Sequence, residues 1–426
     1  MFRINISRIA VAGAVASALA AGGAQASGFA LMEQNSSGLG NAYSGQGAAA
    51  ENASTIFFNP AGMTLLPGRQ VSGSLELVQP SAKFTNSGAS RNGLGAFAPG
   101  GGDNGGDAAG LAGIPNGYLS WQLTDSLWAG VGLTVPFGLS TKYDVNFIGR
   151  FQSQSSEVKT LDINPSLAWR PVSWLSVGGG FSIQRGSIKI MRSVPVAGER
   201  LSTIDIDDTG WGWNVGAMLM PADATRIGVS YRSAIKYNLE GKFTSNAPGA
   251  VSPVGDVSLA IKVPDTWGLS GSQRFGDVQL LADYTYTRWS VVQSPQLIAQ
   301  TTTLGVAPGG VLSTFSLLFR NTYRAGLGVN YDLNPAWMLK AGVAYDKSPV
   351  TDTTRTVFLP DNNRTWLSVG AKWRPSKELT VDVGYAHLFI SDGSINNIQL
   401  ATGGGNVVGT YKSYVNILGG QLTYRF

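Results

Sequence analysis

The last residues of the chain alternate between apolar and polar side chains and end on an aromatic residue that is also the C-terminus. Leu422, Tyr424 and Phe426 fall on one face of an extended strand, whereas Thr423 and Arg425 fall on the other. Such a strand suits a sheet that meets lipid on one side and a water-filled lumen on the other. This ending is typical of the β-barrels of the bacterial outer membrane.

The N-terminal residues have the pattern of a secretory signal peptide. Arg3 and Arg8 precede a short apolar stretch, and Ala24-Gln25-Ala26 provides a cleavage site of small residues. The apolar stretch is shorter than the ~20 residues that span a membrane, so we expect cleavage rather than anchoring. We therefore assign residues 1–26 to the signal peptide.

The composition excludes several classes of protein. Cysteine is absent, which rules out disulfides and thiolate metal sites. The net charge of +5 falls to +3 when the two arginines of the signal peptide are removed, which is too little to predict nucleic-acid binding. No mature segment has an apolar run that could form a transmembrane helix. We predict no metal and no cofactor.

From about Arg69 onward the apolar residues recur with period two rather than 3.6, which predicts strands. In the segment 337–346, for example, the odd-numbered residues are apolar or aromatic and most even-numbered ones are small, polar or charged. Short polar turns and longer, less regular loops alternate along the chain, as in an outer-membrane barrel. The turns fall at 124–126, 170–173, 221–224, 275–277, 332–335 and 374–377.

The segments around these turns predict a fourteen-stranded antiparallel transmembrane β-barrel over residues 69–426. An even number of strands puts both ends of the barrel on the periplasmic side. The predicted strands start near Val71, Asn116, Leu127, Val158, Leu175, Gly210, Thr225, Val257, Val278, Asn321, Trp337, Thr356, Leu379 and Lys412.

Two regions lack the alternation of barrel strands. Residues 87–113 are rich in Gly, Ala and Asn, which predicts a mobile outward loop. Residues 27–68 precede the first strand, and a fourteen-stranded barrel has a lumen too wide for its own side chains to fill. We predict that residues 27–68 form a plug, or hatch, inside the lumen.

The hatch segment resembles a known family. Three stretches, 27–30, 35–47 and 58–62 (SGFA, NSSGLGNAYSGQG and FNPAG), closely resemble the N-terminal hatch of the outer-membrane long-chain fatty-acid transporters, the FadL/TodX (OMPP1) family. Further similar pieces lie at 136–139, 231–233, 264–267, 323–328, 346–350 and 364–368. The resemblance implies a lumenal ligand pocket, and release sideways through an opening where one strand kinks beside the hatch.

The resemblance places that opening at two motifs. Asn59-Pro60-Ala61 is the hatch motif, and Pro136-Phe137-Gly138 lies at the kink. A proline inside a strand removes a ladder hydrogen bond, and a glycine permits a sharp bend. Without the family context, both motifs would read as an ordinary turn and a bulge. With it, we expect the hatch motif to cover backbone groups that the kink leaves unpaired, since such groups are costly in hydrocarbon.

A fatty acid needs a long apolar slot and a partner for its carboxylate. Where the resemblance implies basic pocket residues, the chain has the uncharged Ser187 and Ile298. Arg185, Lys189 and Arg192 are candidate replacements. Other candidates are predicted by alternation to point inward, where they either bind ligand or form ion pairs that stabilise the barrel: Arg232, Lys236, Arg324, Lys340, Asp283 and Asp346. Phe29 resembles the family position that reaches the pocket.

We predict a passive, monomeric outer-membrane channel for long-chain fatty acids, in contact with membrane lipid or detergent. Uptake of aromatic or alkane hydrocarbons is the alternative, favoured by the missing basic residues. A general porin would have no hatch. An outer-membrane hydrolase would need His387, the single histidine, beside an activated serine. Alternation instead points His387 outward near the rim, so we predict no catalytic residues.

Overall fold

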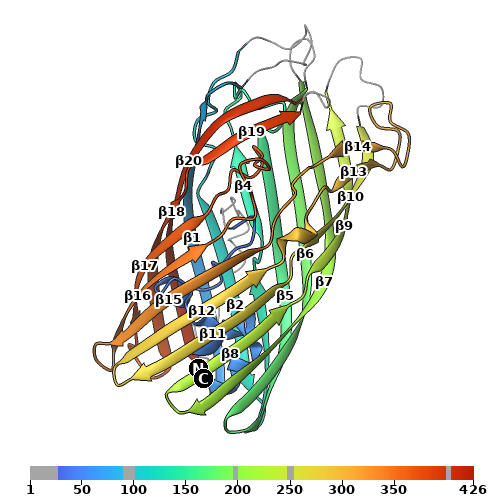
Figure 1. The fold of residues 1–426 in the computed structure, drawn as a ribbon. Helices are drawn as coiled ribbons and strands as arrows, with labels where there is room; N and C mark the ends of the chain where they lie inside the picture. The colour runs from blue at the N-terminus through green and yellow to red at the C-terminus, as the bar shows by residue number, and fades with distance from the viewer. Residues whose placement is uncertain (1–26, 90–100, 195–199, 247–253, 400–403) are drawn as a thin grey trace, which may run out of the picture.

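The computed structural model describes residues 27–89, 101–194, 200–246, 254–399 and 404–426, so the predicted signal peptide lies outside the described residues. Twenty strand segments pair into one sheet, which closes as an antiparallel barrel of fourteen strands (Figure 1). The predicted fold class is confirmed.

Eight of the fourteen strands are continuous, and each of the other six consists of two segments. The continuous strands are β1 (Arg69–Asn86), β2 (Ala112–Gln122), β5 (Ser155–Val172), β6 (Leu175–Val194), β7 (Arg200–Ala222), β16 (Trp337–Asp346), β17 (Arg364–Trp373) and β20 (Gly405–Arg425). The divided strands are β3 (Leu127–Thr134) with β4 (Gly138–Lys142), β8 (Thr225–Arg232) with β9 (Ile235–Ser245), β10 (Val254–Val263) with β11 (Thr266–Phe275), β12 (Val278–Thr287) with β13 (Gln296–Ala299), β14 (Val311–Thr314) with β15 (Thr322–Asp332), and β18 (Leu379–Ile390) with β19 (Gly393–Gln399).

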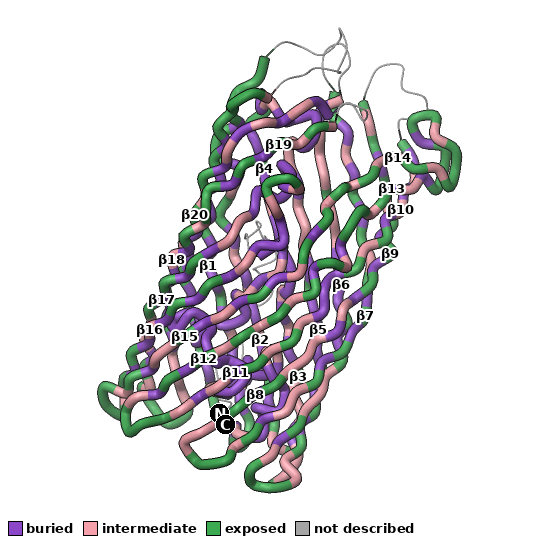
Figure 2. Tube along the Cα trace, viewed as in Figure 1, coloured by how far each residue is buried: buried purple, intermediate pink, exposed green. Residues whose placement is uncertain are grey.

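The C-terminal strand closes the barrel. β20 pairs with β1 along its length, and the Phe426 amide donates to the Arg69 carbonyl at 2.9 Å. Leu422 and Tyr424 are exposed on the outer face, whereas Gln421 and Thr423 are buried on the inner face. The C-terminus lies at the end of the barrel where short turns join the strands (Figure 1). Buried and exposed residues alternate along the strands (Figure 2), as the period-two pattern predicts.

Most predicted strand starts lie within a few residues of the observed ones. The starts near Gly210 and Lys412 are too late, because those strands begin at Arg200 and Gly405. The start near Thr356 is wrong, because that strand begins at Arg364. The residues between them form a loop in which Val357 and Leu359 are 0% and 3% exposed. Their apolar side chains pack inward over the barrel mouth, so the apolar pattern reflects burial rather than a strand. Among the described residues, no helix is long and apolar enough to cross a membrane.

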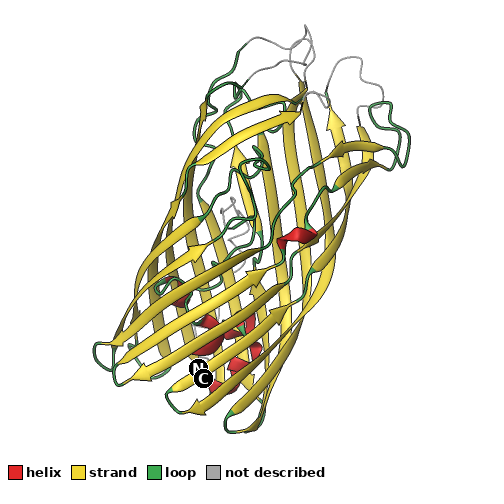
Figure 3. Cartoon of the chain, in the orientation of Figure 1, coloured by secondary structure: helices red, strands yellow, loops and turns green. Residues whose placement is uncertain are grey.

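The segment Ser27–Gly68 lies inside the barrel. It contains four short helical turns, α2 (Ser36–Leu39), α3 (Gln46–Ala49), α4 (Thr55–Phe58) and η1 (Pro60–Leu65), most of them in the lower half of the lumen (Figure 3). Glycines of the wall make room for it: a Cβ on Gly216 would lie 2.1 Å from the Asn59 side chain, and one on Gly342 would lie 2.2 Å from the Asn41 carbonyl.

A buried charge cluster ties this segment to the wall. Lys340 of β16 lies 2.7 Å from the Glu51 carboxylate and 3.3 Å from Asp382, and Lys372 pairs with the same two acids. Although burial alone would raise the pKa of Glu51, Lys340 and Lys372 hold it well below its usual range. The charges are mutually compensated, so the cluster acts as a structural clamp.

The predicted outward loop is only partly described. Residues 90–100 lie outside the described residues, whereas residues 101–111 fold back onto the barrel. The Asp107 carboxylate accepts hydrogen bonds from the Ser81 hydroxyl at 2.6 Å and from the Ala82 amide at 2.8 Å. This part of the loop therefore has fixed partners at the end of β1.

Candidate ligand cavity and wall opening

The strand formed by β3 and β4 is interrupted at Pro136. Thr134 lies opposite Asp162, and Gly138 lies opposite Lys159. The kinked strand therefore advances four residues where β5 advances three, so it contains one extra residue. Such an insertion is a β-bulge, which bends the strand. The Thr160 hydroxyl takes the place of the missing ladder partner, because it donates to the Phe137 carbonyl at 2.8 Å and accepts from the Phe137 amide at 2.9 Å.

On the other side of the kink the wall is open. Pairing between β2 and β3 ends where Gly117 lies opposite Leu133, and residues 112–116 of β2 pair with β1 alone. Neither β3 nor β4 continues this ladder above that point. The barrel wall therefore has a gap in its hydrogen bonding between β2 and the kinked strand.

The start of the lumenal segment pairs with the kinked strand. The Leu31 amide donates to the Pro136 carbonyl at 2.8 Å, and the Gly138 amide donates to the Phe29 carbonyl at 2.9 Å. Ala30 and Phe137 thus form an antiparallel bridge pair. Residues 29–31 therefore supply the backbone hydrogen bonds at the kink that β2 does not provide.

Residues 33 and 34 line the same gap. The Gln34 side chain donates to the Val135 carbonyl at 3.0 Å, and the Gln34 carbonyl accepts from the Tyr118 hydroxyl at 2.8 Å. The Glu33 carbonyl accepts from the Asn116 side chain at 2.9 Å. The lumenal segment therefore bridges the two edges of the gap, which supplies partners for backbone groups that would otherwise be costly in lipid.

The Asn59-Pro60-Ala61 motif lies elsewhere on the wall. The Asn59 side chain donates to the carbonyls of Gly47 and Ala217, at 2.8 and 3.0 Å, and accepts from the Ala61 amide at 3.1 Å. Asn59 thus caps η1 and docks on β7, and the backbone of the kink is paired by residues 29–31 instead. Pro60 nevertheless lines the same cavity, of about 140 Å³, as Pro136 and Phe137.

Four aromatic rings meet above this cavity. Phe29 lies 4.7 Å from Trp289 and 5.8 Å from Phe137 between ring centroids, and Phe319 lies 5.6 Å from Trp289. All four are buried. Trp289, which is not among the predicted site residues, begins the short helix η2 (Trp289–Val291) after β12. The alternation of β12, continued to position 289, places this side chain on the lumenal face. A large aromatic residue is unusual on that face, so the sequence pattern could have indicated Trp289 as a site residue.

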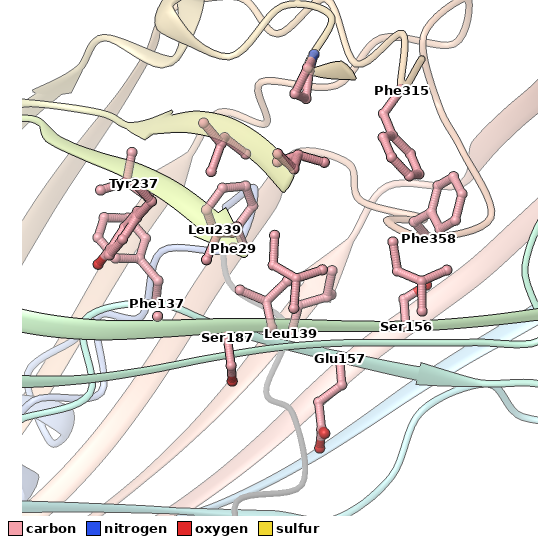
Figure 4. Close-up of a pocket in the computed structure, with 18 of the residues that line it drawn as sticks. Phe29, Phe137, Leu139, Ser156, Glu157, Ser187, Tyr237, Leu239, Phe315 and Phe358 are labelled. Carbon is pink, nitrogen blue, oxygen red and sulfur yellow. The ribbon is translucent and has the colours of Figure 1, made fainter. Parts of the chain in front are cut away.

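An apolar cavity of about 100 Å³ lies beside this aromatic cluster (Figure 4). No lysine or arginine is among the residues that line it. Glu157 and Ser187 point away to the other side of the strands, as the close-up shows. The lining includes Phe29, Phe137, Leu139, Val158, Ile188, Leu239, Leu259, Ile261, Phe315 and Leu359.

A polar cavity of about 390 Å³ adjoins the apolar one, since the two share Ile190, Phe315, Leu317 and Phe358 as lining residues. Arg192 is the one cationic residue that lines it, among hydroxyl and amide side chains. Within the described part of the chain, no carboxylate forms an ion pair with Arg192. The wall therefore presents a cation next to an apolar slot.

Comparison with known proteins decides the family. Residues 17–426 match the family described as outer membrane protein transport protein (OMPP1/FadL/TodX). The chain belongs to this family. The FadL/TodX assignment agrees with the resemblance in the hatch motifs, and it places the protein in the outer membrane.

Several FadL/TodX relatives match along almost the whole chain. A long-chain fatty acid transport protein of Salmonella typhi is 30% identical to this chain, and the matched region covers 90% of this chain and 92% of the relative. A 47 kDa outer membrane protein of Pasteurella multocida is 30% identical over 97% of both chains. The structure of a Pseudomonas aeruginosa FadL homologue superposes with a TM-score of 0.84 at 25% identity, covering 94% of this chain and all of that one. The toluene transporter TbuX of Ralstonia pickettii shares the fold, with a TM-score of 0.68 at 18% identity over 93% of this chain and all of its own.

Three of the predicted inward cations of this FadL/TodX chain do face the lumen, but each already has partners. Arg232 donates to the Phe57 carbonyl at 3.0 Å and lies 4.4 Å from the Phe57 ring. Arg324 pairs with Asp283 at 3.3 Å, and Lys340 belongs to the charge cluster above. These side chains hold the lumenal segment rather than line the apolar cavity.

Asp346 is also buried on the lumenal side, opposite Arg324 and Arg364 in the neighbouring strands. It lies near the start of the lumenal segment, where the Ser27 hydroxyl donates to the Lys347 carbonyl at 2.8 Å. The Gly28 amide donates to the neighbouring Asp361 at 2.9 Å. These contacts fix the residues that lead into Phe29.

Two candidate replacements for the carboxylate partner are wrong in position. Arg185 and Lys189 lie on the outer face of β6, where they pair with Asp207 at 2.8 Å and Asp205 at 3.0 Å. They follow the alternation of the exposed Ile183, so they point away from the lumen. Ser187 lies two residues from each of them on the same strand, so it also points outward. Ile298 lies between the buried, inward-facing Leu297 and Ala299, so it points outward as well.

The inward prediction for Lys236 is also wrong. Arg232 in β8 pairs with Asn214 of β7, and Glu240 in β9 pairs with Asp207 of β7. The first strand therefore advances eight residues where β7 advances seven, so β8 and β9 contain one extra residue. This bulge at Ser233 reverses the alternation, so Ile235 and Tyr237 face the lumen and Lys236 faces outward.

His387 lies on the outer face of β18. Its Nδ1 atom is 2.8 Å from the Asn416 side-chain oxygen, and its ring packs against Phe389 and Tyr414 at centroid distances of 4.4 and 6.0 Å. These neighbours make it part of an outward aromatic cluster.

Proposed function

We propose that this protein is a passive outer-membrane channel that takes up long-chain fatty acids and releases them sideways into the membrane. The observation that carries the proposal is the pair of adjoining cavities, one apolar and one lined by Arg192, which forms no ion pair with a carboxylate of the described residues. A carboxylate bound at Arg192 would let an alkyl chain extend into the apolar cavity. The names of the matched relatives support this substrate class.

The proposed route passes the aromatic cluster. At about 100 Å³ the apolar cavity holds only part of a long chain, so the cargo must displace one of its walls. Phe29 is the wall element carried by the lumenal segment, and its displacement would join this cavity to the one lined by Pro60, Pro136 and Phe137. That lower cavity lies beside the gap between β2 and the kink. Residues 27–68 thus serve as the hatch, and the path lies within one chain, which supports a monomeric transporter.

A second candidate function is uptake of aromatic or alkane hydrocarbons. The lack of any cation around the apolar cavity favours it, because a neutral hydrocarbon needs no charged partner. The two candidates differ in their need for Arg192.

Replacing Arg192 with Gln separates them. Loss of a charge-assisted hydrogen bond costs about 1.5–3 kcal/mol, so we expect fatty-acid affinity to fall about tenfold to a hundredfold. Binding of an alkane of equal length should not change. Lys189→Gln, on the outer face of the same strand, is the matched control. Unchanged fatty-acid binding in Arg192→Gln would reject the carboxylate site and leave the hydrocarbon reading.

Liposome swelling tests the closed axis. We expect no appreciable permeation of sugars, since the lumenal segment fills the barrel. Sugar permeation comparable to that of a porin would reject the sideways mechanism.

A further inference from the structure

The outer surface of the barrel carries two lysines that face each other without a partner. Lys236 in β9 and Lys262 in β10 lie directly opposite in the antiparallel register, and both are exposed. No ion pair joins either lysine to a carboxylate of the described residues. Like charges placed opposite each other in a sheet are destabilising, so an external anion would stabilise this pair.

Both lysines point away from the lumen. Their strand neighbours Ile235, Tyr237 and Val263 are 3%, 2% and 5% exposed and face inward. Since successive side chains alternate between faces, the two ammonium groups project from the outer face of the barrel.

The lysines lie at the boundary of the lipid-facing surface. The next outward pair down the same two strands is Tyr231 and Trp267, whose rings are 4.4 Å apart, and Trp213 lies 5.0 Å from Tyr231. Below these rings the outer face is apolar, with exposed Val229 and Leu269. Aromatic girdles of this kind mark the edge of the hydrocarbon layer in outer-membrane barrels.

The side of the membrane follows from the topology. β8 rises from the short turn that joins it to β7, and Lys236 lies beyond the girdle on the strand that leads away from that turn. Short turns face the periplasm, so the two lysines are at the outer leaflet. Two other outward cations in this part of the wall, Arg185 and Lys242, are neutralised by Asp207 and Asp256. A second pair of opposed, exposed lysines, Lys83 and Lys412, lies between β1 and β20.

We propose that Lys236 and Lys262 bind a phosphate group of lipopolysaccharide, the phosphorylated glycolipid of the outer leaflet. Its sugar-bound phosphates lie just outside the hydrocarbon layer, at the height of the two ammonium groups. Its acyl chains would pack on the apolar surface below Tyr231 and Trp267. Lysines close to an anionic membrane surface each add measurable affinity.

The test compares lipopolysaccharide binding to the purified full-length protein and to the double variant Lys236→Gln/Lys262→Gln, for example by native mass spectrometry. We expect the double variant to bind about tenfold more weakly or worse. Lys189→Gln, an outward lysine with a carboxylate partner, is the control and should bind as the wild type does. Fatty-acid binding should be unchanged in both, because the site is outside the lumen, so this test is independent of the proposed function.

Two further ligands identify the recognised group. Wild-type protein should bind dephosphorylated lipopolysaccharide as weakly as the double variant binds the intact lipid, and phosphatidylglycerol less tightly than lipopolysaccharide. Equal binding by the double variant, an equal loss in Lys189→Gln, or undiminished binding of the dephosphorylated lipid would each overturn the proposal.

Discussion

At the scale of single residues, Glu33 is the least compensated group beside the wall opening. It is fully buried, and neither of its carboxylate oxygens has a hydrogen-bond partner on another side chain in the described part of the chain. Burial raises the pKa of Glu33 to about 7, against smaller opposing effects of its own backbone amide and of the Arg364 guanidinium. A carboxyl in such a site is more stable protonated, and its ionisation costs folding free energy.

The first prediction concerns the pH dependence of the hatch. Because the pKa of Glu33 is higher in the folded than in the unfolded state, its contribution is fully present below about pH 4.5 and is lost as pH rises towards about 7. The protection factors of residues 29–40 in hydrogen exchange, which are corrected for the intrinsic effect of pH on the exchange rate, should therefore fall over this range, and Glu33→Gln should remove that fall.

The exposed Glu240→Gln serves as the control and should keep the wild-type pH profile. A profile in Glu33→Gln that still follows the wild type would assign the dependence to another group. The expected change is of the order of a few kcal/mol in local opening free energy at most, since one pKa unit corresponds to about 1.4 kcal/mol.

At the scale of elements, the decisive feature is a strand that changes partner. Below the kink, β3 pairs with β2 and β5, and above it β4 pairs with β5 and with residues 29–31. The hatch therefore completes the sheet at the point where the wall is open. In the proposed mechanism, movement of these residues would expose the gap without unfolding a barrel strand.

The second prediction tests this arrangement at Gly138. A Cβ built there lies 3.0 Å from the Leu31 side chain, so the branched side chain of Gly138→Val would fill the space between the kink and Leu31 that the cargo needs at the opening. We expect uptake to fall more than about tenfold while the barrel remains folded and heat-resistant, which gel mobility of unheated samples would show.

Gly73→Val is the matched control, because no atom lies within 4 Å of a Cβ built at that position. Wild-type uptake by Gly138→Val would mean that the cargo leaves by another path. Bulky replacements of Asn59 and Pro60 belong to the same test, since Asn59 docks the hatch on β7.

At the scale of the whole molecule, the barrel and the lumenal segment are joined at two places by different kinds of contact. The Lys340, Glu51, Lys372 and Asp382 cluster and the docking of Asn59 hold the middle of the segment. Its beginning is held by backbone bonds to the kink and by the aromatic cluster around Phe29. The proposed transport needs displacement of this beginning only.

The third prediction uses the absence of cysteine in the chain. Ala30 and Phe137 are a bridge pair flanked by hydrogen bonds, and such pairs have Cα atoms about 4.5 Å apart, within the range of a disulfide. We expect the variant Ala30→Cys/Phe137→Cys to lose uptake when oxidised and to regain it on reduction.

A second cysteine pair, at Thr64 and Ser176, links the later part of the segment to β6, where the two side-chain hydroxyls are 2.6 Å apart. Oxidation of this control should leave uptake unchanged. If oxidised Ala30→Cys/Phe137→Cys still transports, or if the control pair blocks uptake, the proposed motion of the first hatch residues is wrong.

Much of the fold could be read locally. The period of two, the short turns and the aromatic C-terminus predict the strand number and the membrane location, since each depends only on neighbouring residues. The motifs at residues 27–68 indicate the hatch. Phe29 and Arg192 were also predicted, and they lie at the two cavities.

The orientation of individual cations was less predictable. Lys236 faces outward because the bulge at Ser233 reverses the alternation, and a bulge is defined by pairing with a neighbouring strand rather than by local sequence. Arg185 and Lys189 are candidates only through the family resemblance, whereas their alternation with Ile183 places them on the outer face.

The sequence by itself determined a lipid-facing and a lumen-facing side for most strands, because side-chain alternation follows from the geometry of one extended strand. Tertiary structure alone decided which segment completes the wall at the kink, that Trp289 packs on Phe29, and that Arg192 lines a cavity next to the apolar one. These features depend on hydrogen bonds and contacts between residues more than a hundred positions apart, and local sequence carries no record of such pairings.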